Sequence, residues 1–243
     1  MSRITWVAGA LAVTGIISGC ATQAVRGNAS PEEALALLDR TCGKTAPGAG
    51  VSELTGSVWM KANSPEASGQ FPATLKVSGD ERIDMEITNL VGGPVASIRV
   101  DGGKYEIRAH GKGKGGKDLV QKGADTWGGI PLRWAPALFL GRVPCPSDAQ
   151  RASAKLRVDE KGSLVIDAEG ESYVYGYRSW AGSPWPEKLT WRRTASGGAK
   201  NEATEVAFEF DQPDGKSNVA KKWEARSSRG EVKVRWKDRD VRR

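Results

Sequence analysis

The sequence predicts a mainly β protein in which about ten to twelve short strands form an antiparallel meander, a barrel or an open curved sheet. Three observations lead to this fold class. From Ser52 onward, apolar residues alternate with polar ones at a period of two. The alternating segments are short and are separated by turn residues such as Ser78-Gly79-Asp80. One dense apolar stretch, from Trp127 to Pro146, interrupts this pattern and is expected to form a short helix against the sheet.

Residues 1–19 are predicted to be an export signal that is not part of the fold. Arg3 supplies a positive charge, and Ile4 to Ile17 is apolar but too short to span a bilayer comfortably. The sequence Ile17-Ser18-Gly19-Cys20 resembles the lipobox of bacterial lipoproteins, so Cys20 is the predicted lipidation site and residues 20–30 the lipidated tether. Several acyl chains, such as palmitate, would anchor the chain stably. The alternative is a chance cysteine after a plain signal peptide.

Charge and length bound the remainder of the chain. Ala21, in place of an aspartate, implies transport to the periplasmic face of the outer membrane in bacteria of the enteric type. The net charge of +7 favours anionic lipid, lipopolysaccharide or an acidic protein as partner and disfavours nucleic acid. Residues 31–243 have the length of one larger all-β domain. Cys42 and Cys145 are an even pair in an oxidising compartment and are predicted to form a disulfide, the alternative being two buried thiols.

A helix is predicted to open the domain. Ser30-Pro31-Glu32-Glu33 combines a capping serine, a proline at the first position and a glutamate three residues after the cap. Leu35, Leu38 and Cys42 then fall on one face at helical spacing. Gly43 ends the helix.

The predicted strands follow in order. Leu54, Gly56, Val58 and Met60 begin the alternation. Similar segments recur before and after the apolar stretch, near 70–78, 82–88, 95–100, 104–109, 153–158, 163–168, 171–178, 187–193, 203–210, 219–225 and 231–236.

The apolar stretch is too hydrophobic for a solvated loop and too rich in proline for a central strand. A helix of roughly two turns, from about Leu132 to Leu140, is expected to stop at Gly141. Periodicity leaves two interpretations open, a helix that fills an ordinary core and a helix that lines an apolar cavity.

Several motifs with possible chemistry do not form a site. Gly111 to Lys117 has the spacing of a phosphate-binding loop, but Asp118 stands where magnesium coordination needs Ser or Thr, so we interpret it as a flexible basic loop. His110 is the only histidine, which disfavours a histidine-rich metal site or a catalytic triad.

The remaining candidates are carboxylates and tryptophans. Glu169 with Glu171, and Asp238 with Asp240, are expected to be solvated on strand faces. Three tryptophans are candidates for sugar stacking or, more in keeping with their type, for core filling: Trp180, Trp185 and Trp191. We therefore expect no enzymatic activity, no cofactor and no metal.

Beyond the lipobox and the helix, short motifs follow one another from Ser30 to the C-terminus. They are Leu54-Thr55-Gly56-Ser57-Val58, Ser68-Gly69-Gln70-Phe71, Met85-Glu86-Ile87-Thr88-Asn89-Leu90-Val91-Gly92, Gly129-Ile130-Pro131-Leu132-Arg133-Trp134 and Phe139-Leu140-Gly141-Arg142-Val143-Pro144. In this order they resemble the LolB family, outer-membrane lipoproteins that receive other lipoproteins from the periplasmic carrier LolA.

This resemblance implies an incomplete antiparallel β-barrel in which short helices cap an apolar cavity for acyl chains. The cap and cavity residues would be Trp134, Leu138, Phe139 and Leu140. The implied partners are a LolA-like carrier, the acyl chains of lipoprotein cargo and outer-membrane lipid, and we expect a monomer.

One loop departs from the family pattern. Where the family has an Asn-Pro-Leu-Gly-like loop with an exposed leucine that delivers cargo into the membrane, this chain has Asn89-Leu90-Val91-Gly92. Leu90 and Val91 are the predicted membrane-insertion loop, because neighbours on an extended chain point to opposite sides and cannot both face the interior. The alternative is a turn that folds back and buries both.

The sequence thus favours a protein that accepts lipoproteins from a carrier and inserts them into the outer membrane, by transfer between apolar cavities without covalent chemistry. The alternative is a structural or assembly lipoprotein of the cell envelope that contacts lipopolysaccharide or a partner protein.

Overall fold

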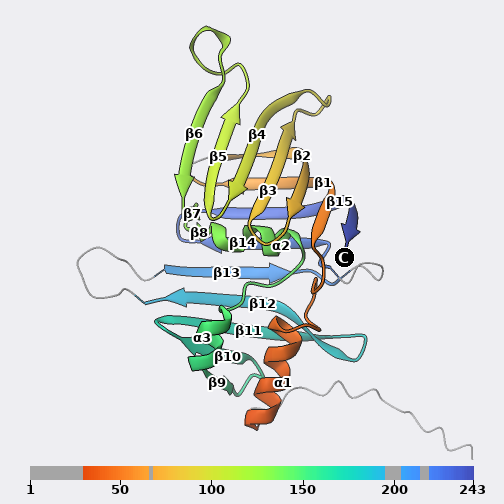
Figure 1. Cartoon of the computed structure of the whole chain (residues 1–243), viewed down its shortest axis with the longest axis vertical. Helices are drawn as coiled ribbons and strands as arrows, with labels where there is room; N and C mark the ends of the chain where they lie inside the picture. Colours follow the sequence, from red (N-terminus) through yellow and green to blue (C-terminus); the bar gives the residue numbers. More distant parts are fainter. Residues whose placement is uncertain (1–29, 66–67, 195–203, 214–218) are drawn as a thin grey trace, which may run out of the picture.

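A single large antiparallel sheet organises the computed structural model, which describes residues 30–65, 68–194, 204–213 and 219–243. Thirteen strands lie in the order β6-β5-β4-β3-β2-β1-β15-β14-β13-β12-β11-β10-β9, and the sheet is curved but not closed (Figure 1). The predicted fold class, a mainly β protein with an incomplete antiparallel barrel, is confirmed. The main strands are β1 (Glu53–Asn63), β2 (Ser68–Ser78), β3 (Arg82–Thr88), β4 (Pro94–Asp101), β5 (Lys104–Ala109), β6 (Leu119–Ala124), β9 (Lys155–Val158), β10 (Leu164–Ala168), β11 (Glu171–Trp180), β12 (Ser183–Arg193), β13 (Thr204–Phe210), β14 (Lys222–Ser227) and β15 (Glu231–Arg242).

Strand β1 joins the two halves of the sheet. It pairs along its whole length with β2 on one side and with β15 on the other, although β15 lies far away in sequence. The register with β15 shifts between Ser57 and Val58, directly after Gly56. A Cβ atom at Gly56 would lie only 2.4 Å from the carbonyl oxygen of Asp238, so a glycine is needed for the strands to approach at this irregularity.

Helix α1 (Pro31–Cys42) begins at the predicted capping box, in which Ser30 and Glu33 bond each other's backbone N–H groups. Its predicted face is confirmed in part, because Leu38 and Cys42 pack against the core. Ala34, Leu37 and Thr41 are buried, whereas Leu35 is 55% exposed. The three-to-four-residue spacing was correct, but the stripe begins one residue earlier, because Thr41 turns inward to bond Tyr177 at 2.7 Å.

The apolar stretch crosses the inside of the curved sheet as a cap. Its elements are β7 (Thr126–Trp127), β8 (Ile130–Pro131), η2 (Leu132–Trp134) and α2 (Ala135–Phe139). The cap helix ends just before Gly141, as predicted. Only glycine fits at this position, because its φ is +79° and a Cβ atom there would lie 2.1 Å from the side chain of Val219. After this turn the chain leads to α3 (Asp148–Ser153), a short helix with a capping box of Ser147 and Gln150 that we did not predict.

Under the cap the interior is filled by the protein's own aromatic side chains. Trp134 makes edge-on contacts with three rings of the C-terminal half, at centroid distances of 4.8–6.3 Å: Tyr173, Trp191 and Phe208. Phe139 packs edge-on against Trp223 and Trp236. Such edge-to-face pairs are a favourable geometry for aromatic rings. The cap helix is therefore a core helix, one of the two interpretations left open by its periodicity.

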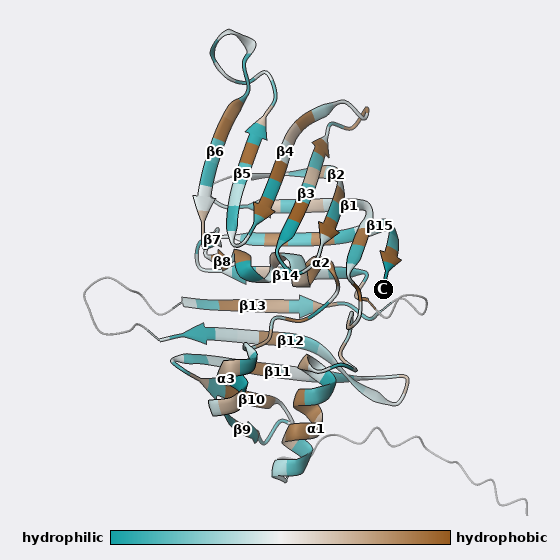
Figure 2. Ribbon diagram, viewed as in Figure 1, coloured by the Kyte–Doolittle hydropathy of each residue, from teal (hydrophilic) through white to brown (hydrophobic). Residues whose placement is uncertain are grey.

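The two ends of the sheet are covered unequally. Helices α1 and α3 lie over β9–β12, and the cap contacts β2, β3, β6 and β14, whereas the far ends of β3–β6 extend beyond these elements as a wing (Figure 1). We call these four strands the wing. Strands β4 and β6 of the wing carry hydrophobic residues, coloured brown in Figure 2. Within the described residues, no helix is long and apolar enough to cross a membrane.

Candidate functional site

The inner face of the wing carries rows of apolar side chains that run across the strands. Directly opposed residues of antiparallel strands share a face, so the registers define each row. The row near the cap consists of Val77, Ile83, Val100 and Tyr105 and ends at Gly123. The next consists of Leu75, Met85, Ile98 and Ile107 and ends at the polar Gln121. The third consists of Ala73, Ile87, Ala96, Ala109 and Leu119.

Burial along these rows falls toward the free edge of the sheet. Members on β2 and β3, such as Leu75 and Met85, are buried. Their row partners Ile98 and Ile107 are only half-buried, and Leu119 on the edge strand is 58% exposed. We define the open inner face as Ala96, Ile98, Ile107, Ala109 and Leu119. The described part of the chain covers this face only in part: Ala96, Ile98 and Ile107 pack against the core at one side, and Leu119 at the edge is exposed.

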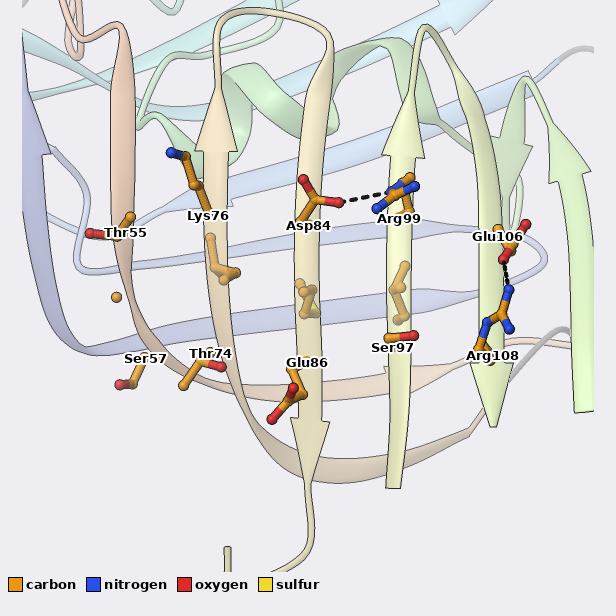
Figure 3. A pocket seen from close by; sticks show the side chains of 14 residues that line it. Thr55, Ser57, Thr74, Lys76, Asp84, Glu86, Ser97, Arg99, Glu106 and Arg108 are labelled. Carbon is orange, nitrogen blue, oxygen red and sulfur yellow. Dashed lines mark hydrogen bonds and ion pairs between the residues drawn. The ribbon is translucent and has the colours of Figure 1, made fainter. Parts of the chain in front are cut away.

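The opposite face of the same strands is polar and holds the wing together. Opposed residues form a row of alternating charge, Lys76, Asp84, Arg99 and Glu106 (Figure 3), which continues to Lys122 on β6. Arg99 donates to Asp84 at 2.8 Å, and Lys122 lies 3.1 Å from Glu106. Cross-strand pairs of opposite charge stabilise a sheet, which matters for strands with few packing contacts on their inner face.

These ion pairs lower the pKa of the carboxylates in the row. For Asp84 the first cause is the hydrogen bond from Arg82, and for Glu106 it is the hydrogen bond from Arg108. The polar face borders a shallow groove of about 780 Å³, lined also by Thr55, Ser57, Thr74, Glu86 and Ser97. Its charges are paired within the sheet, so we assign the groove no ligand.

The turn between β3 and β4 presents the predicted membrane-insertion residues to solvent. Leu90 is 82% exposed and Val91 is 91% exposed, so the turn does not fold back. The Asn89 side chain fixes this conformation by accepting hydrogen bonds from the N–H groups of Val91, at 3.0 Å, and Gly93, at 2.8 Å. Their insertion into a membrane stays a prediction.

The loop between β5 and β6 is the predicted basic loop. Lys112, Lys114 and Lys117 are exposed, and Asp118 accepts a hydrogen bond from the Gly111 N–H at 3.2 Å. That bond, together with the neighbouring His110 and Arg108, lowers the pKa of Asp118. The loop is thus closed by its own carboxylate.

The cap is locked to the sheet by Glu171, which we had expected to be solvated. It is 7% exposed, because Arg133 of the cap and Arg193 of β12 close over it. Arg133 donates to both carboxylate oxygens at 3.0 and 2.8 Å, and Arg193 donates to Oε1 at 2.8 Å. Tyr173 adds a hydrogen bond of 2.6 Å and Trp191 one of 3.2 Å.

Two opposing effects set the pKa of Glu171. Burial raises it, but the Tyr173 hydroxyl and the two guanidinium groups outweigh burial and lower the pKa to about 2. Arg133 also lies over the ring of Trp134, 4.6 Å from its centroid. The carboxylate is thus ionised and holds the start of the cap helix against β11 and β12.

A disulfide between Cys42 and Cys145 ties the end of α1 to the segment that leaves the cap. The Tyr175 hydroxyl donates to the carbonyl oxygen of Pro144 at 2.8 Å beside it. The neighbouring Arg142 binds the loop after α1 by donating to the carbonyl oxygens of Gly48 and Val51. The cap is therefore fastened at both of its ends.

Other residues singled out in the sequence are structural. Trp134, Leu138, Phe139 and Leu140 belong to the cap as expected, but all four are buried in the core and none belongs to the open inner face. Trp185 and Trp191 are buried and Trp180 is half-buried, so they form no sugar platform. Asp238 and Asp240 are exposed as expected.

Two parts of the prediction lie elsewhere. Cys20 and its tether up to residue 29 lie outside the described residues. In the described part of the chain, His, Cys, Asp and Glu form no group that could hold a metal ion. The open inner face was missed although β4 and β5 were predicted, because alternation alone does not tell which strands the core covers. The edge strand β6 was not predicted, and the apolar pair Leu119-Val120 beside the basic loop was the signal for it.

No protein family model and no curated protein matches the chain. Among solved structures, it is similar to a LolA superfamily protein from Nitrosomonas europaea, with 9% identity, 88% of this chain and 94% of that chain covered, and a TM-score of 0.46. It is also similar to the lipoprotein LppX of Mycobacterium tuberculosis, with 17% identity, 85% and 94% covered, and a TM-score of 0.34. At this level of similarity, neither structure carries an argument about function.

Proposed function

We propose that this protein is a lipid-anchored envelope protein that accepts the acyl chains of lipoprotein cargo from a LolA-like periplasmic carrier and delivers them to the outer membrane. The resemblance of its sequence motifs to the LolB family supports this proposal, as do the lipobox at Cys20 and the apolar turn at Leu90 and Val91.

The observation that carries the proposal is the open inner face of the wing. Five apolar side chains on three adjacent strands, Ala96, Ile98, Ile107, Ala109 and Leu119, lie side by side; four are only half-buried by the described residues and Leu119 is exposed. Proteins rarely leave a continuous apolar surface in water unless something binds to it. A flat, strand-lined surface suits extended, flexible hydrocarbon chains better than a compact polar ligand.

The transfer needs no covalent step. Acyl methylenes that leave the carrier for this face remain out of water, and each methylene moved from water to an apolar surface contributes about 0.8 kcal/mol. An open face buries only one side of a chain, which keeps the affinity low enough for release into the bilayer. The acyl site proposed here is therefore the wing, and the filled interior beneath Trp134 is its support.

A structural or assembly role is the second candidate. The interior under the cap favours it, because Trp134 and Phe139 fill the space that an enclosed acyl cavity would need. In that case the wing would be an interface with a partner protein or lipopolysaccharide, and the isolated protein would bind no acyl chain.

Two neighbouring residues of β6 provide a matched test. Leu119 faces inward opposite Ala109, whereas Val120 faces outward opposite Arg108. Both are exposed, so Leu119→Gln and Val120→Gln should leave the fold intact. The measurement is binding of a fluorescent fatty acid to the chain that begins at residue 21.

We expect Leu119→Gln to weaken binding about tenfold, the effect of losing one apolar side chain from a contact, and Val120→Gln to have little effect. Equal binding by both variants would remove the inner face from the proposal. No binding by the unaltered chain would favour the structural role.

A further inference from the structure

Two exposed loops of different chemistry project from one end of the wing. In an antiparallel sheet, the β3–β4 turn and the β5–β6 loop must lie at the same end, and both point upward in Figure 1. They are separated by about two strand spacings, roughly 10 Å. The apolar pair Leu90 and Val91 thus lies beside the basic loop that contains Lys112, Lys114 and Lys117.

The positive charges of this loop are not neutralised by ion pairs within the described residues. The three lysines are exposed, and within the described residues none of them makes an ion pair. The only carboxylate of the loop, Asp118, is already bonded to the Gly111 N–H and lies 3.4 Å from His110. Glu106, on the neighbouring strand, pairs with Arg108 and Lys122.

We propose that this end of the wing docks on a bilayer with anionic headgroups: Leu90 and Val91 enter the apolar layer while the three lysines contact lipid phosphates. The inference rests on the proposed function and deepens it by naming the lipid class that the delivering end recognises. Apolar insertion and a basic patch are the two weak signals that together give stable binding to a membrane surface.

The expected size of the effect follows from surface electrostatics. A lysine close to an anionic membrane strengthens partitioning by about fivefold at moderate ionic strength. Three lysines should therefore strengthen binding to anionic vesicles by more than tenfold, and this gain should decrease as added salt screens the charges. Neutral vesicles should show only the weak contribution of Leu90 and Val91.

The experiment uses the chain from residue 21, which keeps every described element because the described residues begin at Ser30, the cap of α1. Binding is measured by sedimentation with vesicles of phosphatidylcholine alone or mixed with phosphatidylglycerol. The loop variant is Lys112→Gln, Lys114→Gln and Lys117→Gln. The control changes the charge equally elsewhere, at three exposed lysines away from this end: Lys44→Gln, Lys104→Gln and Lys161→Gln.

We expect the unaltered chain and the control to prefer the mixed vesicles, and the loop variant to lose more than tenfold of that binding. Equal binding by the loop variant and the unaltered chain, or an equal loss in the control, would overturn the inference. The fatty-acid titration is run on the same samples. If the unaltered chain binds fatty acid but not the mixed vesicles, the inference about anionic lipid fails and the proposed acyl-chain site stands. If it binds the mixed vesicles but not fatty acid, the proposed acyl-chain site fails and the inference about anionic lipid stands.

Discussion

Glu171 is the residue at which the cap and the sheet depend on one another. Its carboxylate receives hydrogen bonds from four side chains on three elements, Arg133 of η2, Tyr173 of β11, and Trp191 and Arg193 of β12. A buried charge is tolerated only when its hydrogen-bonding capacity is met, so removing this one leaves two guanidinium groups without their counter-ion. The open wing requires a rigid base, and this lock provides part of it.

Glu171→Gln should lower the free energy of unfolding by about 2 kcal/mol at pH 7, because the ion pairs are lost while part of the hydrogen bonding is kept. The folded-state pKa of about 2 lies below the ordinary 4.5. The stabilisation is therefore complete above about pH 4.5 and is lost as the pH falls toward 2. Urea denaturation between pH 7 and 3 should show a steeper loss for the unaltered protein than for Glu171→Gln. Glu169→Gln, on the exposed turn, is the control, and parallel curves for all three proteins would contradict this role.

Sequence reasoning at the residue scale succeeded where chemistry is local. The capping box of Ser30 and the stop at Gly141 are present in the structure, because each needs only its immediate neighbours. The burial of Glu171 was not predicted, because its partners Arg133 and Arg193 are distant in sequence and come into contact with it only in the folded protein. The helix face at Leu35 failed for a similar reason, because Tyr177, distant in sequence, selects which stripe is buried.

Among the elements, the strands of the wing combine two unlike faces. The outer face supplies the alternating charges that pair the strands, and the inner face supplies apolar surface that the core covers only in part. Period-two alternation predicted β1–β5 and β9–β15 but missed β6, where Lys122 and Gly123 break the pattern. Gly123 is explained only by the fold, because a Cβ there would lie 2.4 Å from the ring of Tyr105.

The β3–β4 turn yields a prediction at the scale of one element. Leu90→Glu and Val91→Glu should leave the melting temperature within a few degrees, as surface substitutions usually do. Both should reduce the transfer of lipoprotein to liposomes, because a carboxylate at the tip opposes entry into the apolar layer. The measurement pairs thermal unfolding with a transfer assay from a LolA-like carrier.

Leu35→Glu is the matched control, since Leu35 is also exposed but lies on α1. If both tip variants fail to fold, the turn is part of the core. If both transfer as well as the unaltered protein, the tip has no role in insertion.

The whole molecule has a covered half and an open half. The disulfide, Arg142 and Glu171 fasten the cap to α1 and to β11 and β12, and the wing extends from this base. Helix α1 and the β3–β4 turn lie at opposite ends of the longest axis (Figure 1). Ten residues separate Cys20 from Ser30, a reach of at most about 36 Å. In the proposed function, in which Cys20 is anchored and Leu90 and Val91 touch the same bilayer, this reach limits how far the start of α1 can lie from the membrane.

The central claim, that cargo acyl chains lie on the open inner face, is tested most directly by photo-crosslinking from single positions of β5. A photoreactive residue replaces Ile107, which faces inward, or Glu106, which faces outward. Each protein receives a lipoprotein from the carrier and is then irradiated, and the adducts are identified by mass spectrometry. We predict adducts with the acyl chains from position 107 and none from position 106. Equal labelling from both positions, or labelling from neither while transfer proceeds, would contradict the claim.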